Sequence, residues 1–194
     1  MNFLAHLHLA EVSNSDLLGN LLGDFVRGNP DGQYATKVTE GIRLHRFVDS
    51  FTDSHPAIMN IKPLFGAHRR FSPIALDVFW DHCLIQHWDR FHQDSLLNFC
   101  AKAKQATHPK HITIELPARY QQVIGSMWDR QWIASYKELD NIGFALDKMS
   151  QRTPRMGPLS GCFATLEKHY LELNQVFIEF YPDVIEAVTQ AKLK

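Results

Sequence analysis

A histidine and an aspartate lie four residues apart, at His45 and Asp49, within a segment of helical periodicity. At about 100° per residue, both positions fall within roughly 20° of Val38, on a face that also carries Ile42. An imidazole and a carboxylate one turn apart on an inner helix face can bind one metal ion. They can equally form a structural His–Asp pair, and this segment alone does not separate the two interpretations.

A second helical segment begins near Pro73 and carries acidic residues where apolar ones are expected. Asp81 falls within about 20° of Ile74, on the apolar stripe, and Asp77 lies one turn earlier on its flank. Two carboxylates at this spacing repel each other unless a cation or a proton lies between them. We therefore expect Asp77 and Asp81 to be metal ligands, with the neighbouring His82 close to the same site.

Two further candidates come from the N-terminal part of the chain. Asp24 falls at the edge of a leucine stripe in residues 14–27, where a partly buried carboxylate needs a partner. An aspartate that bonds a neighbouring loop at the end of the helix explains this position equally well. His6 lies between Leu4 and Leu7, where a histidine of the core is the more frequent outcome.

These positions combine histidine and carboxylate side chains without cysteine. Such ligands suit Mn²⁺, Mg²⁺ or Fe²⁺ better than a structural Zn²⁺. An ion held between helices of a bundle can polarise a phosphoryl oxygen and lower the pKa of a bound water. The pattern therefore indicates metal-assisted hydrolysis. The predicted metal ligands are Asp24, His45, Asp49, Asp77 and Asp81.

Positive charge is concentrated in the first third or so of the chain, at Arg27, Arg43, Arg46, Lys62, Arg69 and Arg70. Arg46 lies just off the face that carries His45 and Asp49. Arginines beside a metal ion can hold a phosphate by paired hydrogen bonds, and they can equally receive an acidic protein surface. Ordinary solubilising charge is the remaining alternative, and it applies best to Lys62.

The segments that must position these residues are helical almost throughout. Helical patterns cover residues 14–27, 35–53, 57–69, 72–92, 95–107, 117–134, 136–151 and 159–180, and Pro182 is expected to open a last helix. A loop is expected over 153–158. The only strand signal, Ile112 to Ile114, is very short. We predict one all-α domain over residues 1–194, a helical bundle around a single core.

Composition narrows the class of protein. The 194 residues carry 20 basic and 21 acidic side chains, a formal net charge of −1, so no bulk attraction to nucleic acid or to a membrane is expected. Three cysteines at long spacings form no disulfide framework. The N-terminus shows no signal peptide, and no run of about 18 apolar residues predicts a membrane span. We expect a cytoplasmic protein.

Taken as a set, four N-terminal blocks resemble the acyl carrier protein phosphodiesterase family. The blocks are Met1 to Leu7, Gly19 to Gly28, Gly41 to Asp49 with Thr52 and Asp53, and Leu76 to Val78 with Trp80 to His82. The resemblance extends to Tyr136, to the turn from Arg152 to Arg155 and to Phe180 with Tyr181 and Pro182. It covers essentially the whole chain.

This resemblance implies an all-helical cytoplasmic enzyme that hydrolyses the phosphodiester between 4′-phosphopantetheine and a serine of holo acyl carrier protein. The products are apo acyl carrier protein and 4′-phosphopantetheine. The resemblance also implies a divergent branch of the HD metal-dependent phosphohydrolases, with Mn²⁺ as the favoured ion. In that wider superfamily the adjacent pair reads His-Asp, whereas here it reads Asp81-His82.

Roles follow from the resemblance together with the residue types. A metal-activated water would attack phosphorus beside Asp24, and the metal with Arg46 or Arg27 would stabilise the added charge. His6 and His82 are both candidates for the general acid that protonates the leaving serine. Acyl carrier protein is small and acidic, so we expect it to dock on Arg43, Arg69 and Arg70.

Two other functions remain open at this stage. An HD-type phosphohydrolase could act on a nucleotide or another small phosphoester, although the sequence contains no nucleotide-binding motif. A helical module without catalytic activity could bind a partner through the arginines, and it would bind no divalent ion. Metal analysis and substrate assays separate these alternatives.

Overall fold

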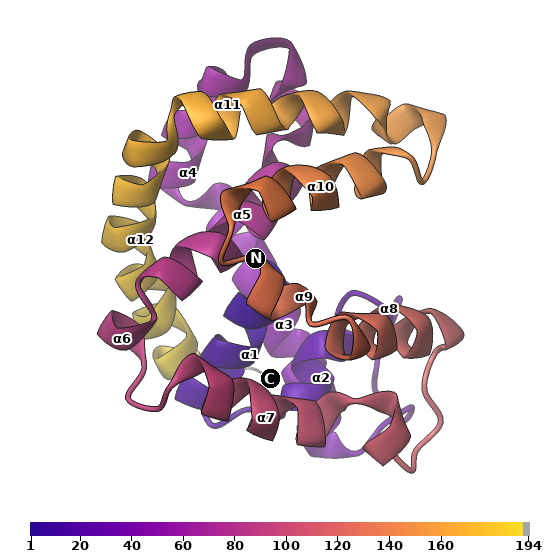
Figure 1. Ribbon diagram of the computed structural model, residues 1–194. Coiled ribbons are helices and arrows are strands. Elements are labelled where there is room, and N and C mark those ends of the chain that lie inside the picture. The colour runs from indigo at the N-terminus through magenta and orange to yellow at the C-terminus, as the bar shows by residue number, and fades with distance from the viewer. Residues whose placement is uncertain (192–194) are drawn as a thin grey trace.

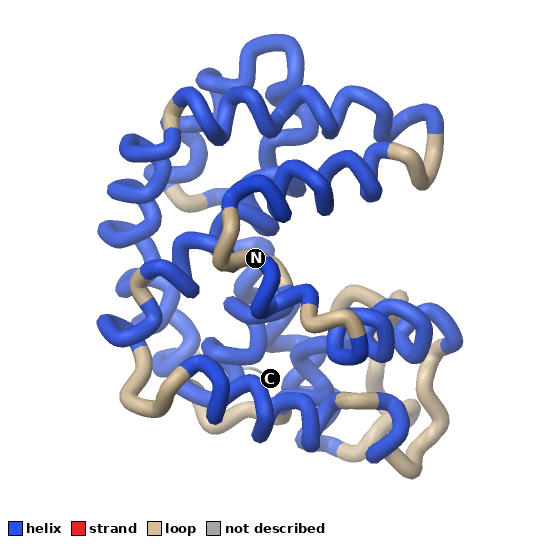
Figure 2. Tube along the Cα trace, viewed as in Figure 1, coloured by secondary structure: helices blue, strands red, loops and turns tan. Residues whose placement is uncertain are grey.

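The computed structural model describes residues 1–191, which form helices joined by turns and loops and no strand (Figures 1 and 2). The longer α-helices are α1 (Phe3–Val12), α3 (Thr36–Ser54), α5 (Ser72–Gln86), α7 (Leu96–Thr107), α8 (Ala118–Asp129), α10 (Leu139–Ser150) and α12 (Tyr170–Gln190). The shorter ones are α2 (Leu17–Leu22), α4 (Pro56–Ile61), α6 (Trp88–Phe91), α9 (Trp132–Ser135) and α11 (Cys162–Lys168). Three 3₁₀-helices are η1 (Lys62–Phe71), η2 (Pro109–His111) and η3 (Pro154–Gly161).

The all-α prediction is confirmed within these residues. The HD-like fold and the single domain over 1–194 stay predictions, and residues 192–194 of that domain lie outside the described part. Among the described residues, no helix combines the length and the apolar character that a membrane crossing requires.

Helix α1 occupies the middle of the molecule, where it packs against α2, α3, α5 and α12. In Figure 1, α10 and α11 lie side by side at one end, and α7 and α8 lie at the other. Residues from Leu4 to Ala10 of α1 are all buried, including His6 and His8. A histidine on this helix therefore needs a partner from a neighbouring helix.

Aromatic side chains of α5 and α12 fill the centre of the core. The ring of Trp80 lies 5.7 Å from that of Phe177 and 5.4 Å from that of Phe180, and the rings of Phe177 and Tyr181 are 4.8 Å apart between centroids. All four side chains are at most 1% exposed. This contact fixes α5, which carries the predicted ligands Asp77 and Asp81, against the C-terminal helix.

The prediction that Pro182 opens a last helix is wrong, because Pro182 lies inside α12. Proline removes one backbone hydrogen bond from a helix interior. Phe180 and Tyr181 before it and Val184 and Val188 after it are nevertheless all buried. Burial along the whole length of α12 outweighs the lost hydrogen bond.

Helix α2 is much shorter than the predicted helix over 14–27. It begins after Asp16, whose carboxylate accepts a hydrogen bond of 2.6 Å from the Gly19 amide, and it ends at Leu22. Asp24 therefore lies in the turn after the helix and not on its leucine stripe, and its side chain is 51% exposed.

The ends of several other helices differ from the predicted ones. The predicted helices over 57–69, 72–92 and 117–134 are each divided into two elements, and the helix predicted over 159–180 is divided among η3, α11 and α12. The expected loop over 153–158 lies in the 3₁₀-helix η3. The Ile112–Ile114 segment forms no strand. These are short-range differences, since 3₁₀ turns and α-helices share similar periodicity over one or two turns.

Candidate metal centre

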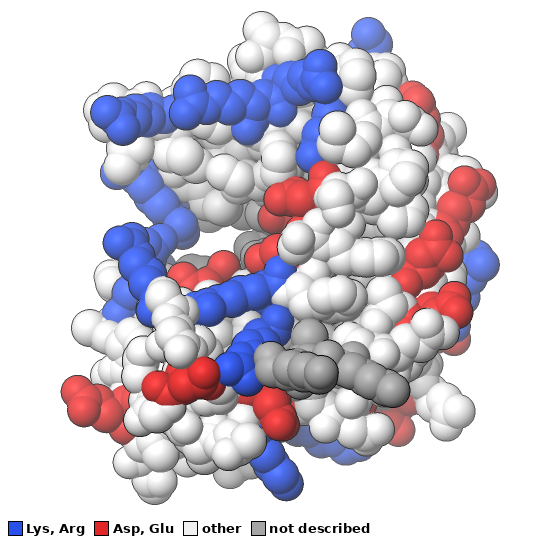
Figure 3. All heavy atoms as spheres, turned by 180° about the vertical axis from the view of Figure 1, so that it is seen from behind, with Lys and Arg blue, Asp and Glu red and all other residues white. Residues whose placement is uncertain are grey.

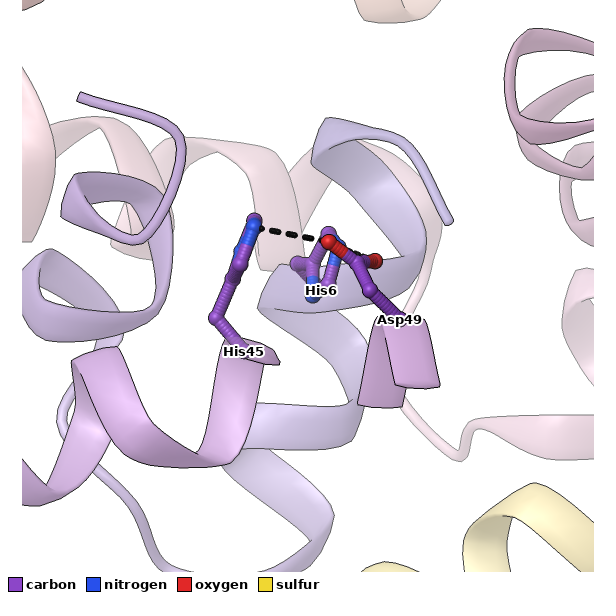
Figure 4. A group of neighbouring side chains, drawn as sticks. All are labelled: His6, His45 and Asp49. Atoms are coloured by element: carbon purple, nitrogen blue, oxygen red, sulfur yellow. Dashed lines mark hydrogen bonds and ion pairs between the residues drawn. The ribbon is translucent and has the colours of Figure 1, made fainter. Parts of the chain in front are cut away.

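His6, His45 and Asp49 meet where α1 packs against α3 (Figure 4). The two imidazole rings are stacked, with centroids 3.8 Å apart and planes inclined by 17°. Asp49 Oδ1 lies 3.1 Å from His6 Nε2, and Asp49 Oδ2 lies 3.2 Å from His45 Nε2. One ligand atom from each residue thus lies within 4.8 Å of the others, an arrangement that could surround one ion.

Helix α3 positions two of these residues as the sequence predicts, since His45 and Asp49 lie one turn apart on the same face. The turn after α2 closes over the His45 ring. A Cβ atom built on Gly23 would lie 2.2 Å from His45 Cγ, so only glycine leaves room for this contact. The sequence pattern could not show that α1 brings His6 to the same point.

Arg46 fixes the loop that follows this turn. Its Nη2 donates a hydrogen bond of 2.6 Å to the Val26 carbonyl, and its Nη1 donates one of 2.8 Å to the Gly28 carbonyl. Gly28 has φ +70°, a conformation that side chains rarely tolerate. Arg46 therefore holds the loop that carries Asp24, and its guanidinium is engaged with backbone.

Burial and pairing give the two imidazoles opposite charge states. Burial, followed by the charge of His45, lowers the pKa of His6 to about 4. Burial would also lower the pKa of His45, but hydrogen bonds to Asp24 and Asp49 raise it to about 9. Burial opposes ionisation of Asp49, yet hydrogen bonds from His45 and His6 hold its pKa far below the usual range. Without a bound ion, His45 carries the positive charge that balances the carboxylates.

Asp24 and Asp77 border this cluster in different ways. Asp24 Oδ1 lies 3.5 Å from His45 Nε2. Asp77 accepts a hydrogen bond of 2.6 Å from the Met1 amino nitrogen, which also lies 3.3 Å from Asp49 Oδ1. Asp24 therefore adjoins the cluster directly, whereas Asp77 reaches it through Met1.

Asp81 has a different environment from the other predicted ligands. It is fully buried, and its carboxylate accepts hydrogen bonds from the Leu4 and Ala5 amides at 3.0 and 2.9 Å and from the Asn2 side chain at 3.0 Å. Burial raises the pKa of Asp81 to about 7. Asp81 thus caps the N-terminus of α1, the helix that carries His6.

His82 is not brought to the cluster. One ring nitrogen bonds the Tyr136 carbonyl at 2.8 Å and the other bonds the Tyr170 hydroxyl at 3.0 Å. Among the described residues, no hydrogen bond or ion pair joins His82 to Asp49 or His45. Its role as general acid stays a prediction that these contacts do not favour.

The predicted docking arginines lie in two places. Arg43 on α3 donates two hydrogen bonds, of 2.7 and 2.8 Å, to the carboxylate of Asp31, so its charge is already balanced. Arg69 and Arg70 are exposed on η1. Arg27 is exposed in the loop after α2.

A pocket of about 830 Å³ opens beside the cluster, with Met1, Asp24 and Asp77 in its wall. Sequence reasoning missed its four cations, Arg119, Arg130, Lys148 and Arg152. An exposed cation on a helix gives the same pattern whether it borders a pocket or faces open water. The available signal was the family resemblance at Tyr136 and Arg152, because both residues line this pocket.

The residues of the cluster fit a divalent cation. Two nitrogens and a carboxylate oxygen gather on the side where Asp24 and Asp49 remain partly exposed, so an ion could enter. The buried Nδ1 atoms of His6 and His45 have no hydrogen-bond partner among the described residues. These are the ring nitrogens that do not contact Asp49, so a water molecule, and not an ion held by the Nε2 atoms, would satisfy them.

The sequence model of the family described as "Acyl carrier protein phosphodiesterase" matches residues 1–184. A protein of that name from Photorhabdus laumondii is 44% identical over 188 residues, which are 96% of this chain and 94% of the relative. Relatives of the same name from Pectobacterium atrosepticum and Escherichia coli are 44% and 38% identical over the full length of both chains. No solved structure matches the chain significantly.

The relatives from Pectobacterium atrosepticum and Escherichia coli cover the whole chain, including α1 and α3 with the cluster and α8 to α10 with the pocket. A family match over residues 1–184 leaves only the last residues of α12 and the C-terminus outside it. The chain belongs to the acyl carrier protein phosphodiesterase family.

Proposed function

We propose that this protein releases 4′-phosphopantetheine from holo acyl carrier protein by hydrolysing the phosphodiester to the modified serine. We further propose that His6, His45 and Asp49 hold a divalent cation, with Asp24 adjoining. Mn²⁺ is the ion that we expect there. The observation that carries the proposal is the convergence of His6, His45 and Asp49 from α1 and α3 beside a pocket whose wall includes Asp24. The family name supports the substrate.

A cation bound there would act as a Lewis acid on a phosphoryl oxygen and make a water molecule more acidic. The chain's own groups prepare the site for this chemistry. Burial disfavours the charged form of Asp24, but its hydrogen bond with His45 holds the pKa below the usual range, so the carboxylate is ionised at neutral pH. It can therefore accept a hydrogen bond from water that enters the pocket.

Arg46 contributes by position under this proposal. Because its guanidinium binds the Val26 and Gly28 carbonyls, it keeps the Asp24 loop closed over His45. Arg27 and Arg46 do not line the pocket, whereas four other cations within residues 1–191 do. Stabilisation of the phosphate charge by Arg27 would need its side chain to move.

The test is incubation of holo acyl carrier protein with chelator-treated protein before and after Mn²⁺ is restored. Mass spectrometry of the carrier protein should show loss of the phosphopantetheine mass only after reloading. A panel of nucleotides should remain intact under the same conditions. Cleavage of a nucleotide but not of the carrier protein would favour the alternative phosphohydrolase, and activity that persists in excess chelator would exclude the metal mechanism.

Three variants connect the activity to the cluster. Asp24→Asn, His45→Ala and Asp49→Asn are each expected to abolish release while the helical circular dichroism spectrum stays unchanged, because strong metal ligands dominate the affinity of such a site. Near-normal turnover at low Mn²⁺ in two of the three would contradict the assignment.

A further inference from the structure

The pocket beside the metal centre has the size of a site for a small organic ligand. Met1, Asp24 and Asp77 lie where it borders the cluster, and α8, α9 and α10 supply much of the remaining lining. Its volume of about 830 Å³ lies within the range of about 300–1,000 Å³ that is typical of sites for small organic molecules.

The lining between these parts is largely apolar. Phe3 of α1, Phe25 of the turn after α2, Val78 of α5, Val123 of α8 and Met149 of α10 all contribute to it. An apolar wall with a few polar groups suits a chain that contains methylene and methyl groups. It does not by itself select a highly charged small molecule.

An aromatic side chain of this lining is unusually exposed. Phe144 on α10 is 61% exposed, and the Lys148 ammonium lies 5.2 Å from the centre of its ring. Aromatic residues are enriched in protein interfaces relative to the rest of the surface.

Four cations of the lining are available to a ligand. The cationic rim consists of Arg119, Arg130, Lys148 and Arg152. All four are exposed, and within residues 1–191 no ion pair or side-chain hydrogen bond engages any of them. Figure 3 shows basic side chains on both sides of a hollow and acidic atoms within it. The acidic residues of the pocket lining are Asp24 and Asp77, which lie next to the metal centre.

A phosphodiester carries two groups, and this pocket can admit only one of them. Under the proposed function, one group is the phosphopantetheine arm, a narrow flexible chain, and the other is a folded carrier protein. A folded protein is far too large for a space of about 830 Å³. With the phosphate at the metal centre, the arm must enter the pocket and the protein must stay outside, against the cationic rim.

We infer that the apolar walls of the pocket bind the phosphopantetheine arm and that the cationic rim receives the acidic surface of the carrier protein around the modified serine. The inference rests on the proposed function and adds to it the site that determines substrate specificity. Opposite charges at such a rim raise the encounter rate and fix the orientation of the bound protein.

The rim is tested by the double variant Lys148→Glu with Arg152→Glu. At low salt, KM for holo acyl carrier protein should rise roughly tenfold or more, because attraction between exposed charges becomes repulsion. The rate at saturating carrier protein should stay within about twofold of the original, because the metal centre is untouched. Addition of salt should raise KM of the unmodified enzyme.

The matched control is Lys37→Glu with Lys168→Glu. Both lysines are exposed, neither lines the pocket, and the change in net charge is the same. KM of this control should remain unchanged. An equal rise of KM in the control would attribute the effect to net charge and overturn the role of the rim.

The arm site is tested by filling the pocket with Val123→Trp. Free 4′-phosphopantetheine should inhibit the unmodified enzyme, whereas inhibition of Val123→Trp should weaken roughly tenfold or more, because the indole occupies the space of the ligand. Mn²⁺ binding should be retained. Ala145→Trp, in the same lining, serves if Val123→Trp does not fold.

The outcomes separate this inference from the proposed function. Failure of the unmodified, Mn²⁺-loaded protein to release phosphopantetheine would refute the proposed function. Normal release together with unchanged KM in the rim variant and unchanged product inhibition in the filled-pocket variant would overturn the inference alone.

Discussion

At the scale of single residues, the central feature is a carboxylate shared by two stacked imidazoles. Asp49 contacts both His6 and His45. Burial and the charge of His45 lower the pKa of His6, whereas hydrogen bonds to Asp24 and Asp49 raise the pKa of His45 although burial opposes this. Like-charged imidazoles cannot both be protonated at 3.8 Å without a large cost. A divalent cation requires neutral nitrogen donors, so its binding at this site would displace the proton that His45 carries in its absence.

Variants of the buried Asp81 show whether it is a metal ligand or a residue that positions α1. Its oxygens accept three hydrogen bonds at the start of α1, and an amide oxygen in Asp81→Asn can still accept some of them. We expect Asp81→Asn to retain Mn²⁺ binding. Asp81→Ala should lower the free energy of unfolding by about 1–3 kcal/mol, because the Leu4 and Ala5 amides lose their partner.

Chemical denaturation and Mn²⁺ titration of both Asp81 variants check this expectation. Loss of Mn²⁺ affinity in Asp81→Asn as severe as in Asp49→Asn, with stability unchanged, would instead show that Asp81 is a ligand.

At the scale of elements, the approach of α2 to α3 determines where the site forms. A Cβ atom on Gly41 would lie 2.8 Å from the Asp16 carbonyl oxygen and 2.9 Å from Gly19 Cα. The two backbones are therefore in contact, and this contact brings the Gly23 turn over His45. A methyl group at this crossing has no flexible neighbour to displace.

Gly41→Ala is expected to lower the free energy of unfolding by about 1–3 kcal/mol, because overpacking forces α2 away from α3. Mn²⁺ affinity should fall with it, since the same shift moves Asp24 and His45. The control is Gly125→Ala in α8, where the nearest atom to the new Cβ lies 3.9 Å away.

Because alanine favours a helix over glycine, Gly125→Ala should raise stability by about 0.5–1 kcal/mol. Thermal unfolding of both variants measures these changes. Equal stability of the two would show that the α2–α3 contact is less tight than described.

The sequence predicted the arrangement of residues within one helix better than the contacts between helices. The spacing of His45 and Asp49 placed them on one helix face, and the apolar periods located the helical regions after residue 14, although several of the predicted helices are divided and α1 was not among them. The same stripe argument treated Asp81 as a ligand, because periodicity reports burial but not which neighbour satisfies a buried carboxylate. The contacts of His6 could not be predicted, since they depend on how α1 packs against α3.

At the scale of the whole molecule, basic side chains nearer the pocket are expected to contribute more to binding of the carrier protein than those farther away. Arg69 and Arg70 lie on η1, which packs against η3, and η3 supplies Met156 to the pocket lining. These arginines can therefore extend the cationic rim outwards. Arg43 is paired with Asp31 and should contribute least.

We expect Arg69→Glu with Arg70→Glu to raise KM for holo acyl carrier protein, but by a smaller factor than Lys148→Glu with Arg152→Glu. The reason is that screened attraction declines over about 8–10 Å near physiological ionic strength. Steady-state kinetics at two salt concentrations measure the order. A larger effect at Arg69 and Arg70 would move the docking surface from the pocket to η1.

The metal centre can be tested against a similar pair elsewhere on the surface. Asp183 Oδ2 on α12 lies 3.3 Å from His55 Nε2, a His–Asp pair outside the cluster in which Asp183 is exposed and His55 is largely buried. Asp183→Asn therefore removes a carboxylate from a histidine in the same way as Asp49→Asn, without touching the proposed ligands.

Calorimetric titration of Mn²⁺ into chelator-treated protein is the most direct measurement of the central claim. The unmodified protein and Asp183→Asn should show the same saturable binding, and Asp49→Asn should bind at least about tenfold more weakly. Absence of saturable binding to the unmodified protein, or equal affinity in Asp49→Asn, would contradict a divalent metal centre at His6, His45 and Asp49.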